Sequence, residues 1–237
     1  MNDFERIYAN LDHLGPGSDA DTLRALSYLA GERPARILDI GCGTGPASRL
    51  LLGHTTAKLV ALDDYPPNLD TLSRAMTGEP AASRLETCCA DMAAIPFPGG
   101  SFDWLWAEGS AYVIGFTHAL ALWKPLLAPG GKLVVSDLVW RGDSPSAAAR
   151  DFWQSEYPDM TTASHRRQQI ADAGYALLAD FELSDGAWLA YYQPLRKRLD
   201  QDPDLAATPA GKMVATEISA WERDREQIAY ACFVLGT

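Results

Sequence analysis

A short apolar stretch that runs into a glycine-rich turn constrains the fold of this chain more than any other segment. The stretch covers residues 37–40, Ile-Leu-Asp-Ile, and Gly41, Gly43 and Gly45 follow at alternate positions. A strand that enters a tight glycine turn before a helix brings bare backbone close to a ligand, because glycine has no Cβ. The dinucleotide pattern G-x-G-x-x-G requires a third glycine where this chain has Pro46. The turn therefore predicts a cofactor site and disfavours a dinucleotide.

Strand and helix patterns alternate along the rest of the chain. Strands are predicted at 36–40, 58–62, 84–88, 102–107, 132–137, 176–182 and 228–235. Helices are predicted at 4–13, 18–30, 45–53, 66–77, 116–127, 145–157, 162–173, 187–200 and 208–225. Several strands are almost wholly apolar, as in a parallel sheet covered on both faces. The order predicts an α/β, doubly wound domain with a helical insertion before its last strand.

Charge and composition narrow the classes of function. The chain has 237 residues, of which 47% are hydrophobic and 22% charged, and its formal net charge is −11. A negative field repels polyanions, so nucleic-acid binding and docking on an anionic membrane are disfavoured. The short basic clusters at 166–167 and 196–198 are expected to lie on solvated helix faces. A small molecule is therefore the expected partner.

The four cysteines are expected to be free thiols. Cys88 and Cys89 are adjacent, and neither Cys42 nor Cys232 belongs to a C-x-x-C pair, so no zinc site and no easy disulfide is indicated. Residues 1–6 lack the apolar core of an export signal, and no apolar run approaches the ~20 residues of a membrane span. These features predict a cytoplasmic protein whose reaction needs no metal.

Further segments follow the glycine turn in a defined order, each beside the end of a predicted strand. Asp63 ends the stretch Val-Ala-Leu-Asp, Asp91 follows the next strand, and residues 127–133 read Leu-Ala-Pro-Gly-Gly-Lys-Leu. With Asp39 ahead of the glycines, the turn reads D-x-G-x-G-x-G. This combination resembles the class I S-adenosylmethionine (SAM) methyltransferases. Glu108-Gly109, together with residues 156–158 and 188–195, resembles a bacterial UbiE-like small-molecule subgroup.

The resemblance implies a Rossmann-like sheet of seven mostly parallel strands, the last antiparallel, and SAM as the cofactor. The cofactor-binding residues that it implies are Asp39, Gly41, Cys42, Gly43, Gly45, Asp63, Asp91 and Met92. Asp39 would orient the cofactor indirectly. Asp63 would accept hydrogen bonds from the ribose hydroxyls, with Asp64 as a less favoured neighbour, and Asp91 would accept from the adenine amino group.

Candidate catalytic residues follow the fourth strand. Glu108 is a candidate to bind the substrate, to act as a base or to face the sulfonium, and it is equally a candidate to cap the next helix. Tyr112 would place a hydroxyl near the methyl group or pack in the core. His118 is expected to be structural or exposed rather than catalytic. The N/D-P-P-Y signature of amide and nucleobase methylation is missing, which disfavours such acceptors.

An aromatic group supplies the candidate substrate-binding residues. Trp188, Tyr191 and Tyr192 lie at i, i+3 and i+4, so they would line a pocket that favours an apolar or cationic substrate, or form a helix's buried face. Core packing is the favoured interpretation. Trp153 and Tyr157 form a second pair with the same two interpretations.

The N-terminal segment is assigned by resemblance alone. Residues 14–18, Leu-Gly-Pro-Gly-Ser, resemble a stretch that folds over the cofactor in the subgroup. Phe4 and Tyr8 then become candidates for a lid, and Tyr8 is also a candidate substrate-binding residue. Packing of the N-terminal helix would explain both aromatic side chains equally well.

A single domain is expected over residues 1–237. It comprises a helical cap or lid (1–33), a SAM-binding core (34–140) and a substrate-side half (141–237) that holds the insertion at about 185–225. The predicted function is methyl transfer from SAM to a small-molecule nucleophile, yielding S-adenosylhomocysteine (SAH). The alternatives are a non-catalytic SAM-binding regulatory protein and an NAD(P)-dependent oxidoreductase. Homodimer formation and the identity of the methyl acceptor stay open.

Overall fold

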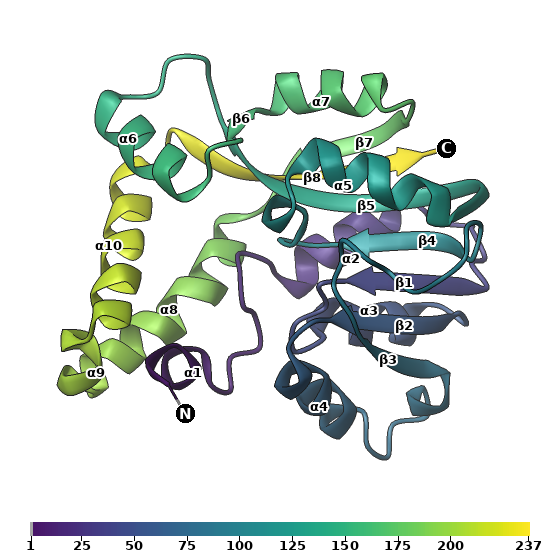
Figure 1. Ribbon diagram of the computed structural model, residues 1–237, viewed down its shortest axis with the longest axis horizontal. Coiled ribbons are helices and arrows are strands. Elements are labelled where there is room, and N and C mark those ends of the chain that lie inside the picture. The colour runs from purple at the N-terminus through teal and green to yellow at the C-terminus, as the bar shows by residue number, and fades with distance from the viewer. Residues whose placement is uncertain (1) are drawn as a thin grey trace.

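A twisted sheet with the strand order β3-β2-β1-β4-β5-β8-β7 forms the centre of the protein (Figure 1), seen in a computed structural model that describes residues 2–237. Its strands are β1 (Arg36–Ile40), β2 (Lys58–Asp63), β3 (Leu85–Cys89), β4 (Phe102–Ala107), β5 (Leu127–Trp140), β6 (Thr161–Thr162), β7 (Ala176–Glu182) and β8 (Ile228–Gly236). Strands β1 to β5 pair in parallel, whereas β8 runs antiparallel to both β5 and β7. The predicted fold class and the antiparallel last strand are confirmed.

All seven predicted strands are present, with two differences. The two-residue strand β6, which pairs with β5, was not expected from the sequence. Strand β5 also begins earlier than predicted, at Leu127, because the Pro-Gly-Gly segment forms an irregularity within it. The register against β4 shifts between Phe102 and Trp104, and Gly130 has a φ of +76°.

The helices are α1 (Asp3–Tyr8), α2 (Asp19–Ser27), α3 (Pro46–His54), α4 (Pro66–Ala75), α5 (Phe116–Trp123), α6 (Ala147–Glu156), α7 (Ala163–Asp172), α8 (Asp185–Gln201), α9 (Pro203–Ala207) and α10 (Pro209–Asp224). All nine predicted helices are present, and α9 is a short helix that was not predicted. The Ser18 hydroxyl accepts from the Asp21 amide and caps α2, at the residue where the sequence predicts this helix to begin. Within residues 2–237, no helix combines the length and the apolar character that crossing a membrane requires.

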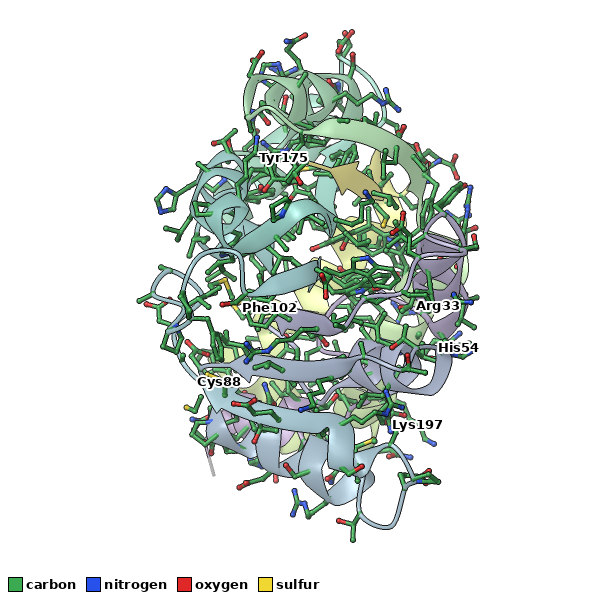
Figure 2. The ribbon with its side chains drawn as sticks, turned by 90° about the vertical axis from the view of Figure 1, so that its right-hand side faces the viewer. Arg33, His54, Cys88, Phe102, Tyr175 and Lys197 are labelled. Carbon is green, nitrogen blue, oxygen red and sulfur yellow. The ribbon has the colours of Figure 1, made fainter. Side chains whose placement is uncertain are left out.

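Alternate residues of the central strands face two separate cores. Leu38 and Ile40 of β1 pack in a cluster with residues of α5 and α7, whereas Ile37 packs with residues of α2, α3 and α4. Figure 2 shows side chains filling both sides of the sheet, with the fully buried Phe102 inside and His54 at the surface. Coverage of both faces explains why the central strands β1, β2 and β5 contain long apolar runs, whereas β3 at the edge of the sheet is partly exposed.

A helical layer stands at the carboxyl ends of the parallel strands (Figure 1). A third apolar cluster joins five helices to the C-terminal end of β5 and the N-terminal end of β8. The helices are α1, α6, α8, α9 and α10. Polar contacts attach α1 to this layer: the Arg6 guanidinium donates to Asp202 over 2.8 Å, and Arg198 donates to the Ile7 carbonyl. The layer therefore encloses the edge of the sheet where ligands bind in α/β proteins.

Three local expectations were wrong. Helix α1 ends at Tyr8 rather than at residue 13, and Asn10 follows in the left-handed region with a φ of +56°. The pattern of residues 18–30 predicts a buried face of Leu23, Leu26 and Leu29. Helix α2 instead buries Asp21, Thr22 and Ala25. Leu23 and Leu26 are only half-buried, whereas Leu29, beyond the end of the helix, is buried as predicted. Hydrogen bonds account for the burial of the two polar residues, because Asp21 accepts from Ser184 and Thr22 donates to Glu108.

The third correction concerns the basic pair at 166–167. Arg167 is exposed, as expected of a solvated face, but the Arg166 guanidinium is completely buried. Its Nε donates to Asp137 Oδ2 over 2.7 Å, and Asp137 is buried as well. A buried arginine at such a position requires a buried carboxylate partner, which a helix pattern does not reveal.

Replacing Gly45 by alanine should destabilise the fold. Its φ is +84°, and an added Cβ would lie 2.4 Å from Leu72 Cδ1. The left-handed backbone costs about 1–2 kcal/mol for alanine, and overpacking adds about 1–3 kcal/mol. We expect the free energy of unfolding, measured in urea, to fall by both amounts together. Gly78→Ala is the control, because Gly78 has the same φ and open space around it. Equal losses in the two variants would contradict the packing argument.

Candidate functional site

The glycine turn between β1 and α3 is held against the end of β2. The amides of Gly41 and Cys42 both donate to the Leu62 carbonyl, over 2.8 and 2.9 Å. Gly41, Gly43 and Gly45 have φ values of +70°, +55° and +84°, in the region that favours glycine. The local backbone therefore requires glycine at all three predicted positions.

The three glycines differ in what their missing side chains make room for. A Cβ on Gly41 would lie 2.6 Å from Ser110 Cβ, so this position permits the loop after β4 to approach. A Cβ on Gly43 would only touch Leu14, at 3.4 Å. Gly45, as described above, makes room for α4. Gly41 and Gly43 face the candidate cofactor site, whereas Gly45 serves the packing of α3 on α4.

Asp39 lies beneath the turn and is buried. The Ser48 hydroxyl at the start of α3 donates to Asp39 Oδ2 over 2.6 Å. Burial raises the pKa of Asp39 to about 7, although the Ser48 hydrogen bond opposes this shift. The position suits an indirect role, because Asp39 fixes the helix that follows the glycine turn.

Asp63 ties the turn to the next strand and helix. Its Oδ2 accepts from the Gly43 amide over 2.9 Å, while Oδ1 accepts from the Tyr65 amide and the Asn68 side chain, each over 3.0 Å. Asp91 lies two residues beyond Cys89, the register partner of Asp63. Asp63 thus ends β2, and Asp91 follows the end of the neighbouring strand β3 at the same edge of the sheet.

The segment that carries Asp91 is fixed from α5. Asp91 is exposed and accepts from the Ala93 amide over 2.7 Å. The Met92 carbonyl accepts from Trp123 Nε1 over 3.0 Å. The Asp91 side chain is therefore exposed, and the neighbouring Met92 is held in place by Trp123.

Glu108 directly follows β4 and is half-buried. Its Oε1 accepts from Trp106 Nε1 over 2.7 Å, and both oxygens accept from the Thr22 hydroxyl over 2.9 and 3.0 Å. Burial raises the pKa of Glu108 to about 7, against the lowering effect of these hydrogen bonds. These hydrogen bonds hold the carboxylate against Thr22 of α2 and Trp106 of β4, whereas no hydrogen bond joins it to the start of the next helix among the described residues.

A small cavity of about 100 Å³ lies between the glycine turn and the N-terminal segment. Asp39, Gly41, Gly43 and Glu108 line one side, and residues 12–17 cover the other. We call residues 12–17 the strap. Its first residue is tethered to the turn, because the Thr44 hydroxyl donates to the Asp12 carbonyl over 2.6 Å. Its last residue is tethered to α8, because the Gly17 amide donates to the Ala187 carbonyl.

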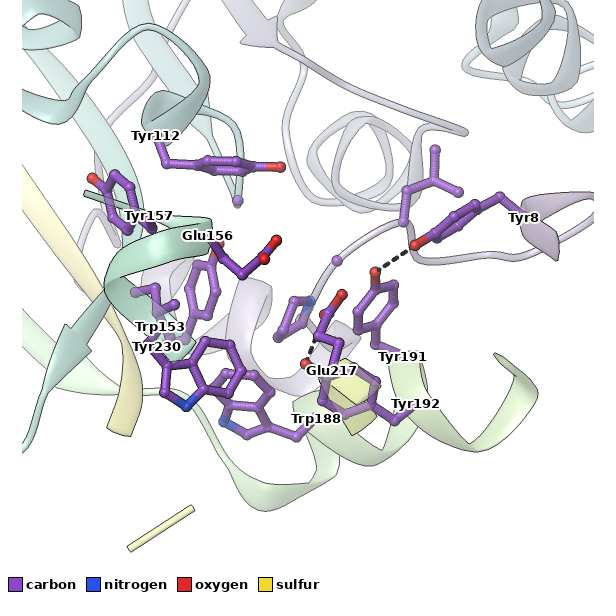
Figure 3. Close-up of a pocket in the computed structure, with 15 residues that line it drawn as sticks. Tyr8, Tyr112, Trp153, Glu156, Tyr157, Trp188, Tyr191, Tyr192, Glu217 and Tyr230 are labelled. Carbon is purple, nitrogen blue, oxygen red and sulfur yellow. Dashed lines mark hydrogen bonds between the residues drawn. The ribbon is translucent and has the colours of Figure 1, made fainter. Parts of the chain in front are cut away.

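A larger cavity of about 340 Å³ opens between the sheet edge and the helical layer (Figure 3). We call it the aromatic cavity, and its aromatic wall consists of Tyr8, Tyr112, Trp153, Tyr157, Trp188, Tyr191, Tyr192 and Tyr230. The strap residues Leu14, Gly15 and Pro16, together with Gly109, line both this cavity and the small one. The two cavities are therefore neighbours across one thin wall.

All four predicted substrate-binding residues line the aromatic cavity. Trp188, Tyr191 and Tyr192 also pack in the cluster of the helical layer, so both interpretations of their spacing hold at once. The hydroxyls of Tyr8 and Tyr191 lie 3.3 Å apart, and this contact joins α1 to α8. Phe4 does not line this cavity; it lies in a surface groove beside α4.

The predicted catalytic residues are separated by the structure. Tyr112 lines the aromatic cavity and packs edge-on against Tyr157, whereas Glu108 lines the small cavity under the strap. His118 is exposed on α5. Within the described residues, no group of three His, Cys, Asp or Glu side chains is arranged to hold a metal ion, and the four cysteines are free.

A buried polar network supports the wall of the aromatic cavity. The Tyr157 hydroxyl donates to Asp137 over 3.0 Å and accepts from Arg166 over 2.7 Å. Burial raises the pKa of Asp137 to about 6, and the Arg166 charge opposes the shift. These bonds fix the Tyr157 ring, so the network positions a cavity residue without touching the cavity itself.

Two acidic residues of the aromatic cavity were missed as site candidates. Glu156 ends α6 and Glu217 lies within α10, and both line the cavity. Glu156 was noted only within the segment that carries the family resemblance. Glu217 lies on the buried side of α10, one residue before Ile218. The available signal for Glu217 was an acidic residue beside the buried residues of α10. The signal was not sufficient, because the residues that meet Glu217 in the cavity lie on helices far away in the sequence.

Comparisons with known proteins agree with this geometry. Residues 37–131 match the family model described as a methyltransferase domain. The chain is 35% identical over 114 residues to a demethylmenaquinone methyltransferase of Thermus thermophilus. The matched region covers 47% of this chain and 51% of that protein. It is 28% identical over 215 residues to a malonyl-(acyl-carrier protein) O-methyltransferase of Herminiimonas arsenicoxydans, with 88% and 77% covered.

Solved structures show the same fold. A SAM-dependent methyltransferase from Geobacter sulfurreducens, in complex with SAH, superposes with a TM-score of 0.81 at 16% identity and covers 98% of this chain and 96% of that one. The chain spans about half the length of several curated relatives that it matches. Together the matches confirm the predicted resemblance, the fold class and SAM as the cofactor of the proteins it resembles.

The buried carboxyls should make stability depend on pH. The pKa of Asp39 is raised from 3.8 to about 7, so the folded state keeps a proton that the unfolded state has lost. The stabilisation is complete below the unfolded value and is lost as pH rises toward 7, at up to about 1.4 kcal/mol per pH unit. We expect Asp39→Asn to reduce this decline in urea unfolding, and the exposed Asp70→Asn to leave it unchanged. An unaltered slope in Asp39→Asn would contradict the assignment.

Proposed function

We propose that this chain, whose residues 37–131 match a methyltransferase domain, transfers a methyl group from SAM to a small molecule and releases SAH. The observation that carries the proposal is the pair of neighbouring cavities. The small cavity offers the glycine turn and the acidic residues Asp39 and Glu108, and the aromatic cavity adjoins it across the strap and Gly109. A donor on one side and an acceptor on the other would meet at this wall, which is the arrangement that group transfer needs.

The cofactor residues receive roles from their positions. Asp63 at the end of β2 and Asp91 just beyond the end of β3 supply the acceptors proposed for the ribose hydroxyls and the adenine amino group. The backbone of Gly41 and Gly43 would border the methionine part, with Cys42 between them. Asp39 would act through Ser48 and the turn, because its carboxylate is turned into the core.

Bound SAM supplies a methyl group on a sulfonium, which is an excellent leaving group. The chain's part is to align the acceptor and to exclude water. We assign Tyr112 to the acceptor side, because it lines the aromatic cavity. We assign Glu108 to the cofactor side, where its negative charge would face the cationic end of SAM. From the sequence alone, Glu108 and Tyr112 were both predicted as catalytic residues.

The acceptor side fits a small molecule. The cavity of about 340 Å³ lies in the range of small-ligand sites. The names of the matched relatives include an acidic acceptor, malonyl-(acyl-carrier protein), but no Arg, Lys or His is among the described residues that line this cavity. We therefore propose an acceptor without a carboxylate at the reacting end.

The remaining proposals concern organisation. We propose that residues 1–33 serve as a cap, 34–140 as the cofactor core and 141–237 as the substrate side. The contacts of α1 with α8 and α9 support the cap, since they place Tyr8 in the cavity wall. Four free thiols support a cytoplasmic location. Homodimer formation stays a prediction.

The alternatives are distinguished by ligand binding and by turnover. An oxidoreductase would bind NAD(P), and the geometry disfavours it because Pro46 begins α3 where the dinucleotide pattern has glycine. A regulatory protein would bind SAH and release none from SAM with any acceptor. Calorimetry with SAH and NAD, followed by SAH release over an acceptor panel, separates the three.

Asp63→Asn should weaken SAH binding. The change removes the charge that ribose hydroxyls would meet and keeps an acceptor for the Gly43 amide. We expect the calorimetric Kd for SAH to rise about 10–100-fold, as loss of a charged hydrogen-bond acceptor costs about 1.5–3 kcal/mol. Asp64→Asn is the matched control, because Asp64 is the exposed neighbour. A larger effect at position 64 would reverse the assignment.

Glu108→Gln and Tyr112→Phe should affect different substrates. Because the two residues line different cavities, Glu108→Gln is expected to raise the Kd for SAM several-fold, since SAM carries the sulfonium charge that SAH lacks. Tyr112→Phe is expected to change kcat or the acceptor KM while the Kd for SAM stays within twofold. The measurements are calorimetry with SAM and steady-state SAH release. A loss of kcat in Glu108→Gln with unchanged SAM binding would instead identify Glu108 as a base.

A further inference from the structure

The aromatic cavity contains acidic side chains and no basic ones. Glu156 and Glu217 line it, and among the described lining residues there is no Arg, Lys or His. Figure 3 shows the two carboxylates, from α6 and α10, pointing toward the middle of the cavity. Carboxylates that face a partly enclosed space without a cation leave a negative site to be neutralised by a ligand.

Glu217 is fixed in this orientation. It is half-buried, and its Oε1 accepts from the Tyr192 hydroxyl over 2.9 Å. Burial raises the pKa of Glu217; the Tyr192 hydrogen bond opposes the shift, and the charge of Glu156 adds to it. The two carboxylates therefore repel one another across the same space, and a cation between them would relieve that repulsion.

The charge of Glu217 reaches the surrounding tyrosines. The pKa values of Tyr8, Tyr112, Tyr191, Tyr192 and Tyr230 are all raised, first by burial and in addition by the Glu217 charge. These hydroxyls stay protonated, so the rings are neutral donors and π faces. The field inside the cavity comes from the carboxylates.

The aromatic rings form a continuous wall around this space. Trp188 lies 5.9 Å from Tyr192 and 5.7 Å from Tyr230 between ring centroids, and Tyr191 lies 4.9 Å from Tyr192. Among the described residues, the one cation over a ring of this wall is Arg166, outside the cavity and behind Tyr157. Aromatic faces with nearby carboxylates are the chemistry that binds ammonium groups.

On the premise of the proposed methyl transfer, we propose that the acceptor is a small organic cation, whose ammonium group lies between Glu156 and Glu217 and against the rings of Trp188, Tyr191 and Tyr192. A neutral apolar acceptor would leave both carboxylates unpaired on binding. An anionic acceptor would be repelled by them and would find no basic side chain. The proposal concerns recognition of the charge and leaves the methylated atom open.

A matched pair of probes tests the charge. Choline and its neutral carbon isostere, 3,3-dimethyl-1-butanol, have nearly the same shape and differ in the charge of one atom. We expect choline to bind the full chain, with and without SAH at pH 8, at least tenfold more tightly in calorimetry. Equal affinity, or tighter binding of the neutral isostere, would overturn the proposal.

Charge-neutral variants test the two carboxylates. Glu217→Gln and Glu156→Gln keep the side-chain shape, and each is expected to reduce the choline affinity about tenfold while the isostere is unaffected. Glu222→Gln is the control, because Glu222 lies on α10 with the same charge but pairs with Arg196 at the surface. If Glu217→Gln impairs folding, as thermal melting would show, the exposed Glu156 still gives the answer. An unchanged choline affinity in Glu156→Gln would overturn the proposal.

The cationic acceptor and the proposed methyl transfer can be contradicted by different results. Failure to bind SAH would contradict methyl transfer, while choline binding by the chain alone would still report on the cavity. Release of SAH with neutral acceptors, but never with amines or choline-like cations, would support methyl transfer and overturn the cationic acceptor.

Discussion

Two backbone hydrogen bonds, from the Gly41 and Cys42 amides to the Leu62 carbonyl, hold the end of β1 against the end of β2. They exist because the glycines take left-handed conformations that other residues avoid. The glycine turn also places the Gly43 amide where it donates to Asp63, and the Thr44 hydroxyl where it donates to the Asp12 carbonyl of the strap. The small cavity, the start of α3 and the cover over the site all depend on this junction.

In the helical layer at the carboxyl ends of the strands, the same residues stabilise the fold and line the aromatic cavity. Trp188 stacks with Tyr192 and Trp221 and also forms cavity wall. Such aromatic contacts contribute about 0.5–1.5 kcal/mol each beyond the area they bury. A rigid wall follows, because side chains that pack on one side and face a cavity on the other have few alternative rotamers.

Local patterns predicted the sheet and most helices, because apolar runs and caps act over a few residues. The glycine turn, Asp63 and the aromatic spacing at 188–192 were found in this way. Glu217 was not, since its place in the cavity depends on α10 meeting α6 and α8. The buried Arg166 and the polar face of α2 were missed for the same reason: their partners, Asp137 for one and Ser184 and Glu108 for the other, lie far away in sequence.

The strap belongs to both cavities at once. Leu14, Gly15 and Pro16 line both cavities, and hydrogen bonds fix the segment at Asp12 and Gly17. A shift of this segment for one ligand changes the surface that the other ligand meets. If the strap shifts when one cavity is filled, the affinities of the two cavities would be linked, and each ligand would change the affinity of the other by the same factor.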